Sequence, residues 1–75
     1  IRVYTKEPNQ ERPSGEPFIL KAGATVADLA RAIHSFLLTN YKYARIWGPS
    51  SKFPGERVGS SHTLSDLDVV EIHTR

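Results

Sequence analysis

The stretch that decides the fold is residues 25–38, which read Thr-Val-Ala-Asp-Leu-Ala-Arg-Ala-Ile-His-Ser-Phe-Leu-Leu. Thr25 can cap a helix, because its hydroxyl accepts a backbone N–H, and Asp28 three residues later completes a capping-box pattern. The apolar residues that follow recur at helical spacing and form one stripe: Val26, Leu29, Ala30, Ile33 and Leu37. The stretch therefore predicts one amphipathic helix, from about Val26 to Leu38, with a single apolar face to bury.

Strand patterns flank this helix on both sides. Alternating or β-branched runs predict strands at residues 1–5, 18–21, 43–47 and 69–74, with a very short one at 57–59. Proline and glycine predict loops at 6–17 and 50–56, and residues 62–68 suggest a helical turn. One helix among these strands predicts an α+β fold of the β-grasp (ubiquitin-like) kind. In it one main helix packs on a mixed four- to five-stranded sheet, and the first and last strands run parallel in the middle.

The length and composition fit one small domain spanning residues 1–75. The sequence has no cysteine, which favours a reducing compartment, so we expect a cytoplasmic protein. No apolar run approaches the roughly 20 residues that span a bilayer, so we expect no membrane contact. The sequence also has no methionine, with which synthesis starts, so we expect this chain to be part of a longer protein.

The sequence shows no constellation typical of catalysis, metal binding or nucleotide binding. It contains no G-x-S-x-G, H-E-x-x-H or G-x-x-x-x-G-K-[ST] motif. His34, His62 and His73 belong to different predicted elements, whereas a zinc site needs about four converging ligands. Asp66 and Asp68 lie where aspartates commonly bond turn backbone. We therefore expect no catalytic, cofactor-binding or metal-binding residues in this chain.

The residues of functional interest lie on the sheet. If Val3, Ala44, Ile46, Val70 and Ile72 face the helix, alternation puts Glu71 and a set of aromatic and cationic residues on the opposite face. That set is the candidate partner-binding face: Arg2, Tyr4, Tyr43, Arg45, Trp47 and His73. A candidate basic rim adds Lys42, Lys52 and Arg57. Such residues can fill interface pockets, stack on bases or pair with phosphates. Alternatively, Trp47 and Tyr43 simply cover the sheet edge, and the charges of the rim are scattered and solvated.

Five blocks of the sequence carry a family resemblance that covers nearly the whole chain. They are residues 1–6, 23–34, 42–48 (Lys-Tyr-Ala-Arg-Ile-Trp-Gly), 52–59 (Lys-Phe-Pro-Gly-Glu-Arg-Val-Gly) and 62–72. Together they resemble the TGS domain at the C-terminus of developmentally regulated GTP-binding proteins, a branch of the Obg-related GTPases. TGS domains of threonyl-tRNA synthetases and alarmone synthetase/hydrolases usually have a tighter first turn, so the long loop at 6–17 favours the GTPase branch. Glu7-Pro8-Asn9 stands where a more basic, glycine-bearing loop is usual.

The resemblance implies a β-grasp fold and a non-catalytic regulatory domain, excised from the C-terminus of a larger GTPase. It implies that GTP and magnesium bind in the parent's G-domain, outside this chain. The implied partners are RNA, the ribosome or a regulatory protein, with the parent's own G-domain among the candidates, in translation-related regulation. The alternative is a pure protein-docking ubiquitin-like module with no nucleic-acid contact. A ubiquitin-like modifier or sulfur carrier is set aside, because those end in Gly-Gly and this chain ends in Ile72-His73-Thr74-Arg75.

Overall fold

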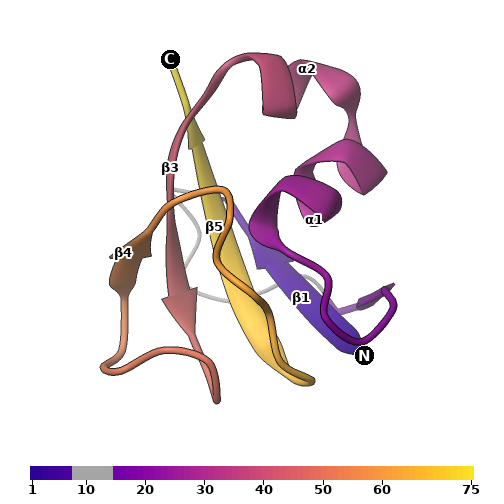
Figure 1. Cartoon of the computed structure of the whole chain (residues 1–75), viewed down its shortest axis with the longest axis vertical. Helices are drawn as coiled ribbons and strands as arrows, with labels where there is room; N and C mark the ends of the chain where they lie inside the picture. The colour runs from indigo at the N-terminus through magenta and orange to yellow at the C-terminus, as the bar shows by residue number, and fades with distance from the viewer. Residues whose placement is uncertain (8–14) are drawn as a thin grey trace.

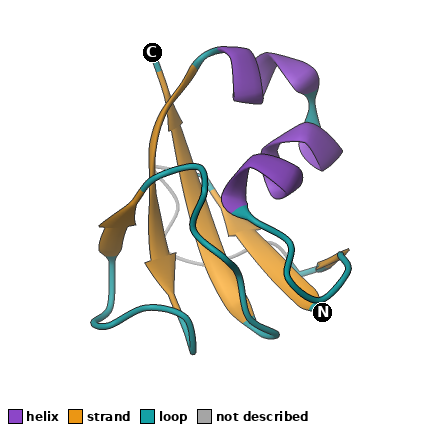
Figure 2. Cartoon of the chain, in the orientation of Figure 1, coloured by secondary structure: helices purple, strands orange, loops and turns teal. Residues whose placement is uncertain are grey.

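Five strands form one mixed sheet, and helices cover one of its faces (Figures 1 and 2). A computed structural model describes residues 1–7 and 15–75, apart from the side chains of Phe36 and Leu38. Most of the predicted first loop, including Pro8 and Asn9, lies outside the described residues. The strands are β1 (Arg2–Lys6), β2 (Phe18–Ile19), β3 (Tyr41–Trp47), β4 (Glu56–Val58) and β5 (Asp68–Thr74), in the spatial order β2-β1-β5-β3-β4.

The pairing of the strands confirms the predicted α+β arrangement. β1 and β5 run parallel in the middle of the sheet, with Tyr4 opposite Val69. β2 pairs with β1, and β3 pairs with both β5 and β4, all antiparallel. The two ends of the sequence therefore form the centre of the sheet, while the short β2 and β4 form its edges.

The main helix begins where the sequence predicts but ends earlier. In α1 (Val26–Ile33) the Thr25 hydroxyl accepts the Asp28 N–H, and the Asp28 carboxylate accepts the Thr25 N–H. The prediction of one helix to Leu38 is wrong, because His34 is extended (φ −171°, ψ 137°) and a separate short helix, α2 (Ser35–Thr39), follows. No proline or glycine marks this break. The apolar spacing also continues across it, since Ile33 and Leu37 line the same groove between helices and sheet.

The core lies between α1 and the covered face of the sheet. Its members are fully or almost fully buried: Val3, Val26, Leu29, Ala44, Ile46, Leu64 and Val70. The strand residues predicted to face the helix do so, with Ile72 half-buried against the same cluster. The register agrees, because Ile46 lies opposite Val70.

Residues 62–68 are not the predicted helical turn. Leu64 donates its N–H to Ala24 O (2.8 Å), and His62 O accepts the Val26 N–H (3.0 Å). The segment therefore bonds the chain entering α1, and Thr63 forms a β-bridge with Thr25. Because these backbone groups have distant partners, they are not available for local helical bonds, which sequence periodicity cannot reveal.

A buried carboxylate ties two loops together at the start of β5. Asp68 is fully buried and accepts the N–H groups of Ser65 (2.7 Å) and Ser50 (3.1 Å) and the Ser50 hydroxyl (2.5 Å). This confirms the predicted turn role of Asp68. A buried charge with three donors is satisfied, and here it joins the loop after β3 to the turn before β5.

Candidate functional site

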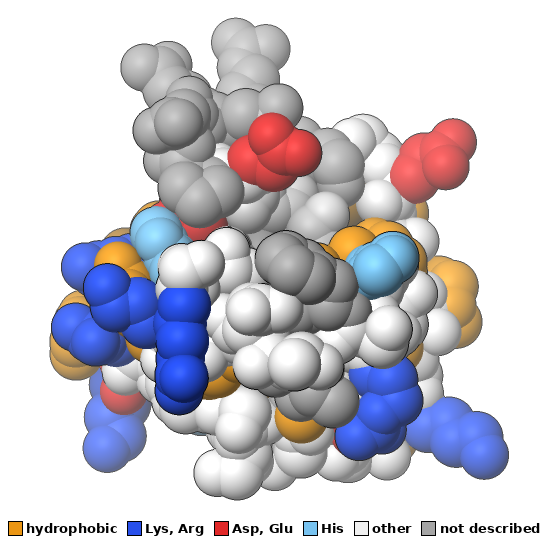
Figure 3. Space-filling model, turned by 90° about the horizontal axis from the view of Figure 1, so that it is seen from above, with side chains coloured by type: hydrophobic (Ala, Val, Ile, Leu, Met, Phe, Trp, Pro, Cys, Tyr) orange, Lys and Arg blue, Asp and Glu red, His pale blue; other side chains and the backbone are white. Residues whose placement is uncertain are grey.

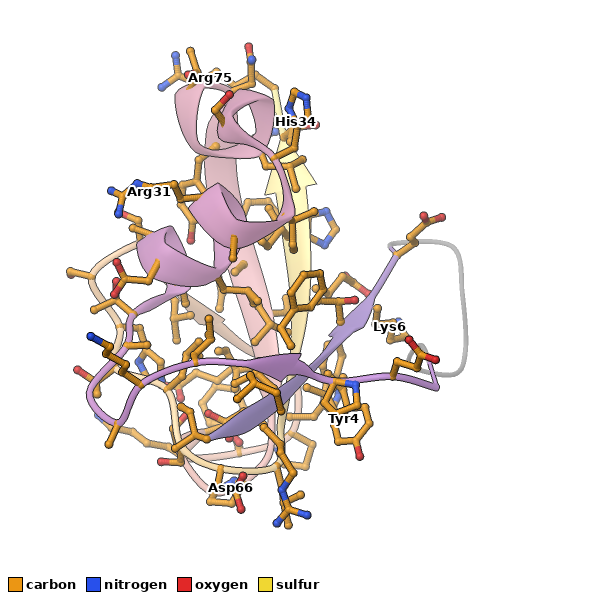
Figure 4. All side chains as sticks on the ribbon, turned by 90° about the vertical axis from the view of Figure 1, so that its right-hand side faces the viewer. Tyr4, Lys6, Arg31, His34, Asp66 and Arg75 are labelled. Carbon is orange, nitrogen blue, oxygen red and sulfur yellow. The ribbon has the colours of Figure 1, made fainter. Side chains whose placement is uncertain are left out.

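Strand alternation exposes one face of the sheet on the side away from the helices. We call this surface the open sheet face; it consists of Arg2, Tyr4 and Lys6 of β1, Val69, Glu71 and His73 of β5, Tyr43, Arg45 and Trp47 of β3, and Arg57 of β4. Figure 4 shows Tyr4 and Lys6 projecting from β1 away from the helices, whereas Arg31 lies on the helix side. The register places Tyr43 beside His73, and Arg45 between Glu71 and Arg57.

Glu71 is the anionic centre of the open sheet face and is 5 % exposed. One carboxylate oxygen accepts a bond from Lys6 Nζ at 2.6 Å, and the other contacts His73 Nε2. Burial raises the pKa of Glu71, but the bonds from Lys6 and His73 more than offset it, so the pKa lies below its ordinary value. Both oxygens of this carboxylate are therefore engaged within the domain.

Tyr43 lies between two other side chains. Its ring stacks on His73 with the centroids 4.4 Å apart, and the Arg57 guanidinium carbon lies 4.0 Å from its centroid. Because β5 and β4 flank β3 on opposite sides, these neighbours approach from opposite sides of the ring. A base could stack on Tyr43 only after one of them moved, so Tyr43 serves here to hold its neighbours.

Trp47 is half-buried and makes contacts on the open sheet face. Lys6 Nζ lies 5.0 Å from its ring, and Gly55 lies on the indole, where an added Cβ would be in ordinary van der Waals contact with Nε1 at 3.5 Å. The indole therefore joins β1 to the turn before β4.

Arg45 and Arg57 lie directly opposite each other on β3 and β4. Arg45 donates one N–H to Gly55 O at 3.2 Å, and its guanidinium carbon lies 5.7 Å from the Tyr43 centroid. Ion pairs among the described residues involve the cations Arg2, Lys6, Arg31 and His73, and neither Arg45 nor Arg57 takes part. Figure 3 shows Lys and Arg side chains gathered at the side of the molecule that carries β4 in Figure 1.

The other predicted site residues lie at the margins. Arg2 is exposed and forms a two-bond pair with Asp66 (2.9 and 3.2 Å). Those bonds lower the pKa of Asp66 to about 2. Lys42 is exposed because an irregularity between Tyr41 and Tyr43 interrupts the alternation. Lys52 is exposed in the loop after β3, whereas Arg57, predicted for the rim, lies on the face itself.

Two residues of this region escaped the sequence reasoning. Lys6 falls in the predicted first loop, although continuing the alternation of β1 by one residue puts it on the open sheet face. Phe53 is 58 % exposed in the turn before β4. Its position in a Lys-Phe-Pro-Gly turn, outside any strand or helix pattern, is the signal that indicates exposure.

Ser50, His62 and Asp68 meet, but not as a nucleophilic triad. The Ser50 hydroxyl donates to Asp68, and its oxygen lies 3.0 Å from His62 Nε2. In a triad the histidine takes the serine proton and the aspartate orients the histidine, so the order here is wrong for that chemistry. Within residues 1–7 and 15–75, no three His, Asp or Glu side chains converge as metal ligands do. The helices of the same ranges are too short or too polar to cross a membrane.

The comparison with protein families gives one decisive match. The family model described as "TGS domain" matches residues 1–74. The chain belongs to the TGS family. This confirms the resemblance and makes the chain a non-catalytic accessory domain with a β-grasp fold.

Curated relatives of this TGS domain are named as GTP-binding proteins. It is 47% identical over 73 residues to an uncharacterized GTP-binding protein of Schizosaccharomyces pombe. It is 40% identical over 72 residues to one of Methanocaldococcus jannaschii, and 39% identical over 70 residues to developmentally-regulated GTP-binding protein 2 of Homo sapiens. These matches cover 96%, 96% and 93% of this chain but only 20%, 18% and 19% of the relatives. The chain thus spans about a fifth of their length.

Proposed function

We propose that this TGS domain is the RNA-contacting accessory domain of a larger cytoplasmic GTP-binding protein, serving translation-related regulation at the ribosome. The GTP-binding relatives, of which it spans about a fifth, support the larger parent. In this proposal the domain lies at the parent's C-terminal end.

The composition of the open sheet face carries the RNA part of the proposal. Four cations, Arg2, Lys6, Arg45 and Arg57, belong to this face. Asp66 pairs with Arg2 and Glu71 with Lys6, so Arg45 and Arg57 are the two without a carboxylate partner among the described residues. Cations and aromatic rings are interleaved, with Lys6 over Trp47 and Arg57 over Tyr43. Proteins bind single-stranded RNA with a positive surface that follows the phosphates. Here the rings of Trp47 and Tyr43 hold the cations in place, and the cations supply the phosphate contacts.

GTP and magnesium do not fit this chain's own residues. A P-loop is a glycine-rich loop that ends in Gly-Lys followed by serine or threonine. No glycine in this sequence is followed by lysine. In our proposal both ligands bind in a G-domain outside this chain, and the TGS domain contributes the RNA contact.

Salt-dependent binding tests the proposal. Fluorescence anisotropy of a 5′-labelled 12-nucleotide oligouridylate should report saturable binding at 50 mM KCl. Because about three phosphate contacts on a single strand give a log–log slope near −2, the affinity should fall at least roughly tenfold at 200 mM KCl. Absence of binding at 50 mM KCl, or an affinity insensitive to salt, would refute an RNA role.

Protein docking remains the second candidate, and one observation favours it. Ile19 and Leu67 are 73 % and 49 % exposed, and both adjoin Arg2: Ile19 lies opposite it, and Leu67 N donates to its carbonyl. We propose that the parent's own G-domain docks on Ile19 and Leu67. Replacing Ile19 and Leu67 with serine should then weaken binding of the separately purified G-domain and leave oligouridylate binding unchanged.

A further inference from the structure

The arginines of β3 and β4 lie directly opposite each other, and among the described residues neither of them forms an ion pair. We propose that Arg45 and Arg57 form a clamp for one phosphate group of a single-stranded RNA backbone. This inference rests on the RNA-contacting function proposed above. It assigns one of the RNA contacts to the part of the open sheet face where β3 and β4 pair.

The first argument is charge. Like charges directly opposite each other on neighbouring strands destabilise a sheet, and Arg45 and Arg57 are such a pair. The carboxylate opposite Arg45 on its other side is Glu71, whose two oxygens are engaged by Lys6 and His73. A phosphate between the guanidinium groups would convert the repulsion into two charge-assisted interactions.

The second argument is orientation. The Arg57 guanidinium lies against the Tyr43 ring at 4.0 Å, and His73 supports that ring from the other side. A guanidinium held through its face keeps its in-plane N–H donors for a ligand. Arg45 is anchored by one N–H on Gly55 O, and the part of the chain that the structure describes offers its guanidinium no ion pair. Both guanidinium groups are therefore held in place before binding. Less side-chain entropy is then lost when they bind an anion.

The third argument concerns the kind of partner. The exposed apolar pair Ile19 and Leu67 adjoins β1 and β2, whereas Arg57 lies on β4 at the opposite edge of the sheet. A protein interface is built around an apolar centre, and this apolar pair lies at the edge away from Arg57. Phe53 is exposed in the turn before β4, and the same turn carries the Gly55 carbonyl that holds Arg45. One exposed aromatic ring in that turn suits stacking on a nucleotide base, which an acidic peptide does not offer.

The test compares oligouridylate binding by the wild-type chain with Arg45→Ala, Arg57→Ala, the double variant and Arg57→Lys. Arg31→Ala is the matched control, because Arg31 is exposed on the helix side and its removal changes the net charge equally. Each single alanine variant should lower the affinity at 50 mM KCl roughly five- to tenfold and make the salt slope shallower by about 0.7, the value for one phosphate. The salt slope of the double variant should be only slightly shallower than that of either single variant, because both arginines hold the same phosphate. Arg57→Lys should keep most of the slope but lose affinity, because lysine cannot form the fork.

The outcomes separate this inference from the function on which it rests. If the wild-type chain does not bind oligouridylate, the RNA role itself fails. If it binds with a steep salt slope but the arginine variants behave like Arg31→Ala, the clamp is wrong and the RNA contact lies elsewhere. A slope loss of about 1.4 in the double variant would mean two separate phosphates and no clamp. If a 12-residue oligoglutamate displaces the RNA at equal concentration, the site is a general anion site. Thermal unfolding checks each variant's fold, and Arg57→Lys keeps the test valid if an alanine variant unfolds.

Discussion

At the scale of single residues, Gly48 is the position where the backbone tolerates least change. Its φ is +141°, and an added Cβ would lie 2.6 Å from Asp68 Oδ1 and 2.9 Å from Asp68 Cα. Gly48→Ala should therefore destabilise the domain by about 1–3 kcal/mol in chemical unfolding. Gly59→Ala is the control, since nothing lies within 4 Å of a Cβ there. Equal effects of the two substitutions would show that the close approach to Asp68 does not matter.

The Arg2–Asp66 pair makes a prediction about pH. Hydrogen bonds from the Arg2 guanidinium and backbone lower the pKa of Asp66 from 3.8 to about 2. A carboxyl with a lowered folded-state pKa contributes stability above its unfolded pKa and loses it as the pH falls through the folded one. The stabilisation should thus be complete above about pH 4 and disappear towards pH 2. Carboxyl NMR titration of the wild-type chain and Arg2→Ala checks this: the variant's Asp66 pKa should rise towards 3.8, and an unchanged value would contradict the pairing.

Sequence reasoning placed single residues on the correct sheet face because the period of a strand is two. The inward set of Val3, Ala44, Ile46 and Val70 followed from that alternation, as did the outward Tyr43 and Arg45. What the pattern could not show is which outward residues pair. Glu71 lies opposite Lys6 on one side and Arg45 on the other. That it binds Lys6 depends on side-chain conformations, which only the folded structure supplies.

At the scale of elements, α1 supplies the helical side of the core, and Leu29 heads the largest fully buried side chains. The Leu29 side chain is fully buried against the sheet, whereas Ile33 near the helix end is half-buried. Leu29→Ala should lower the free energy of unfolding by about 2–5 kcal/mol, a large part of the roughly 5–15 kcal/mol that such a domain has. Ile33→Ala should cost less, because fewer contacts are lost. Urea denaturation measures both, and a larger loss at Ile33 would contradict this order.

Helix starts were more predictable than helix ends. The capping box of Thr25 and Asp28 is a local signal, and the structure contains it. The break at His34 has no local signal, because the apolar spacing from Ile33 to Leu37 fits a continuous helix equally well. Similarly, residues 62–68 are shaped by distant bonds to Ala24 and Val26, which no local pattern contains.

At the scale of the whole molecule, we propose that this TGS domain binds a partner and does not hydrolyse nucleotides. The chain as given should neither bind nor hydrolyse GTP, because its sequence lacks a phosphate-binding glycine loop. Isothermal titration with GTP and magnesium should show no saturable heat, and phosphate release should equal the buffer control. Turnover by the pure chain, together with saturable GTP binding, would overturn this assignment.

The whole-molecule arrangement could be predicted because one helix and a few strands permit few folds. A single apolar helical stripe needs one sheet face to cover, and that requirement leaves the opposite face open. The existence of the open sheet face was therefore predictable. Its division was not: around Glu71 the charges pair within the domain, whereas Arg45 and Arg57 face each other at the β4 edge. That division depends on the register of β3 with β4 and β5.

The central claim is that the open sheet face, and within it the corner formed by β3 and β4, contacts RNA. The most direct test is an NMR titration of the ¹⁵N-labelled chain with the 12-nucleotide oligouridylate. We expect chemical-shift changes concentrated at Tyr43, Arg45 and Arg57 and at the Trp47 indole N–H, with Arg31 on α1 unaffected. Changes concentrated on α1 and α2, or binding that leaves β3 and β4 unperturbed, would contradict it.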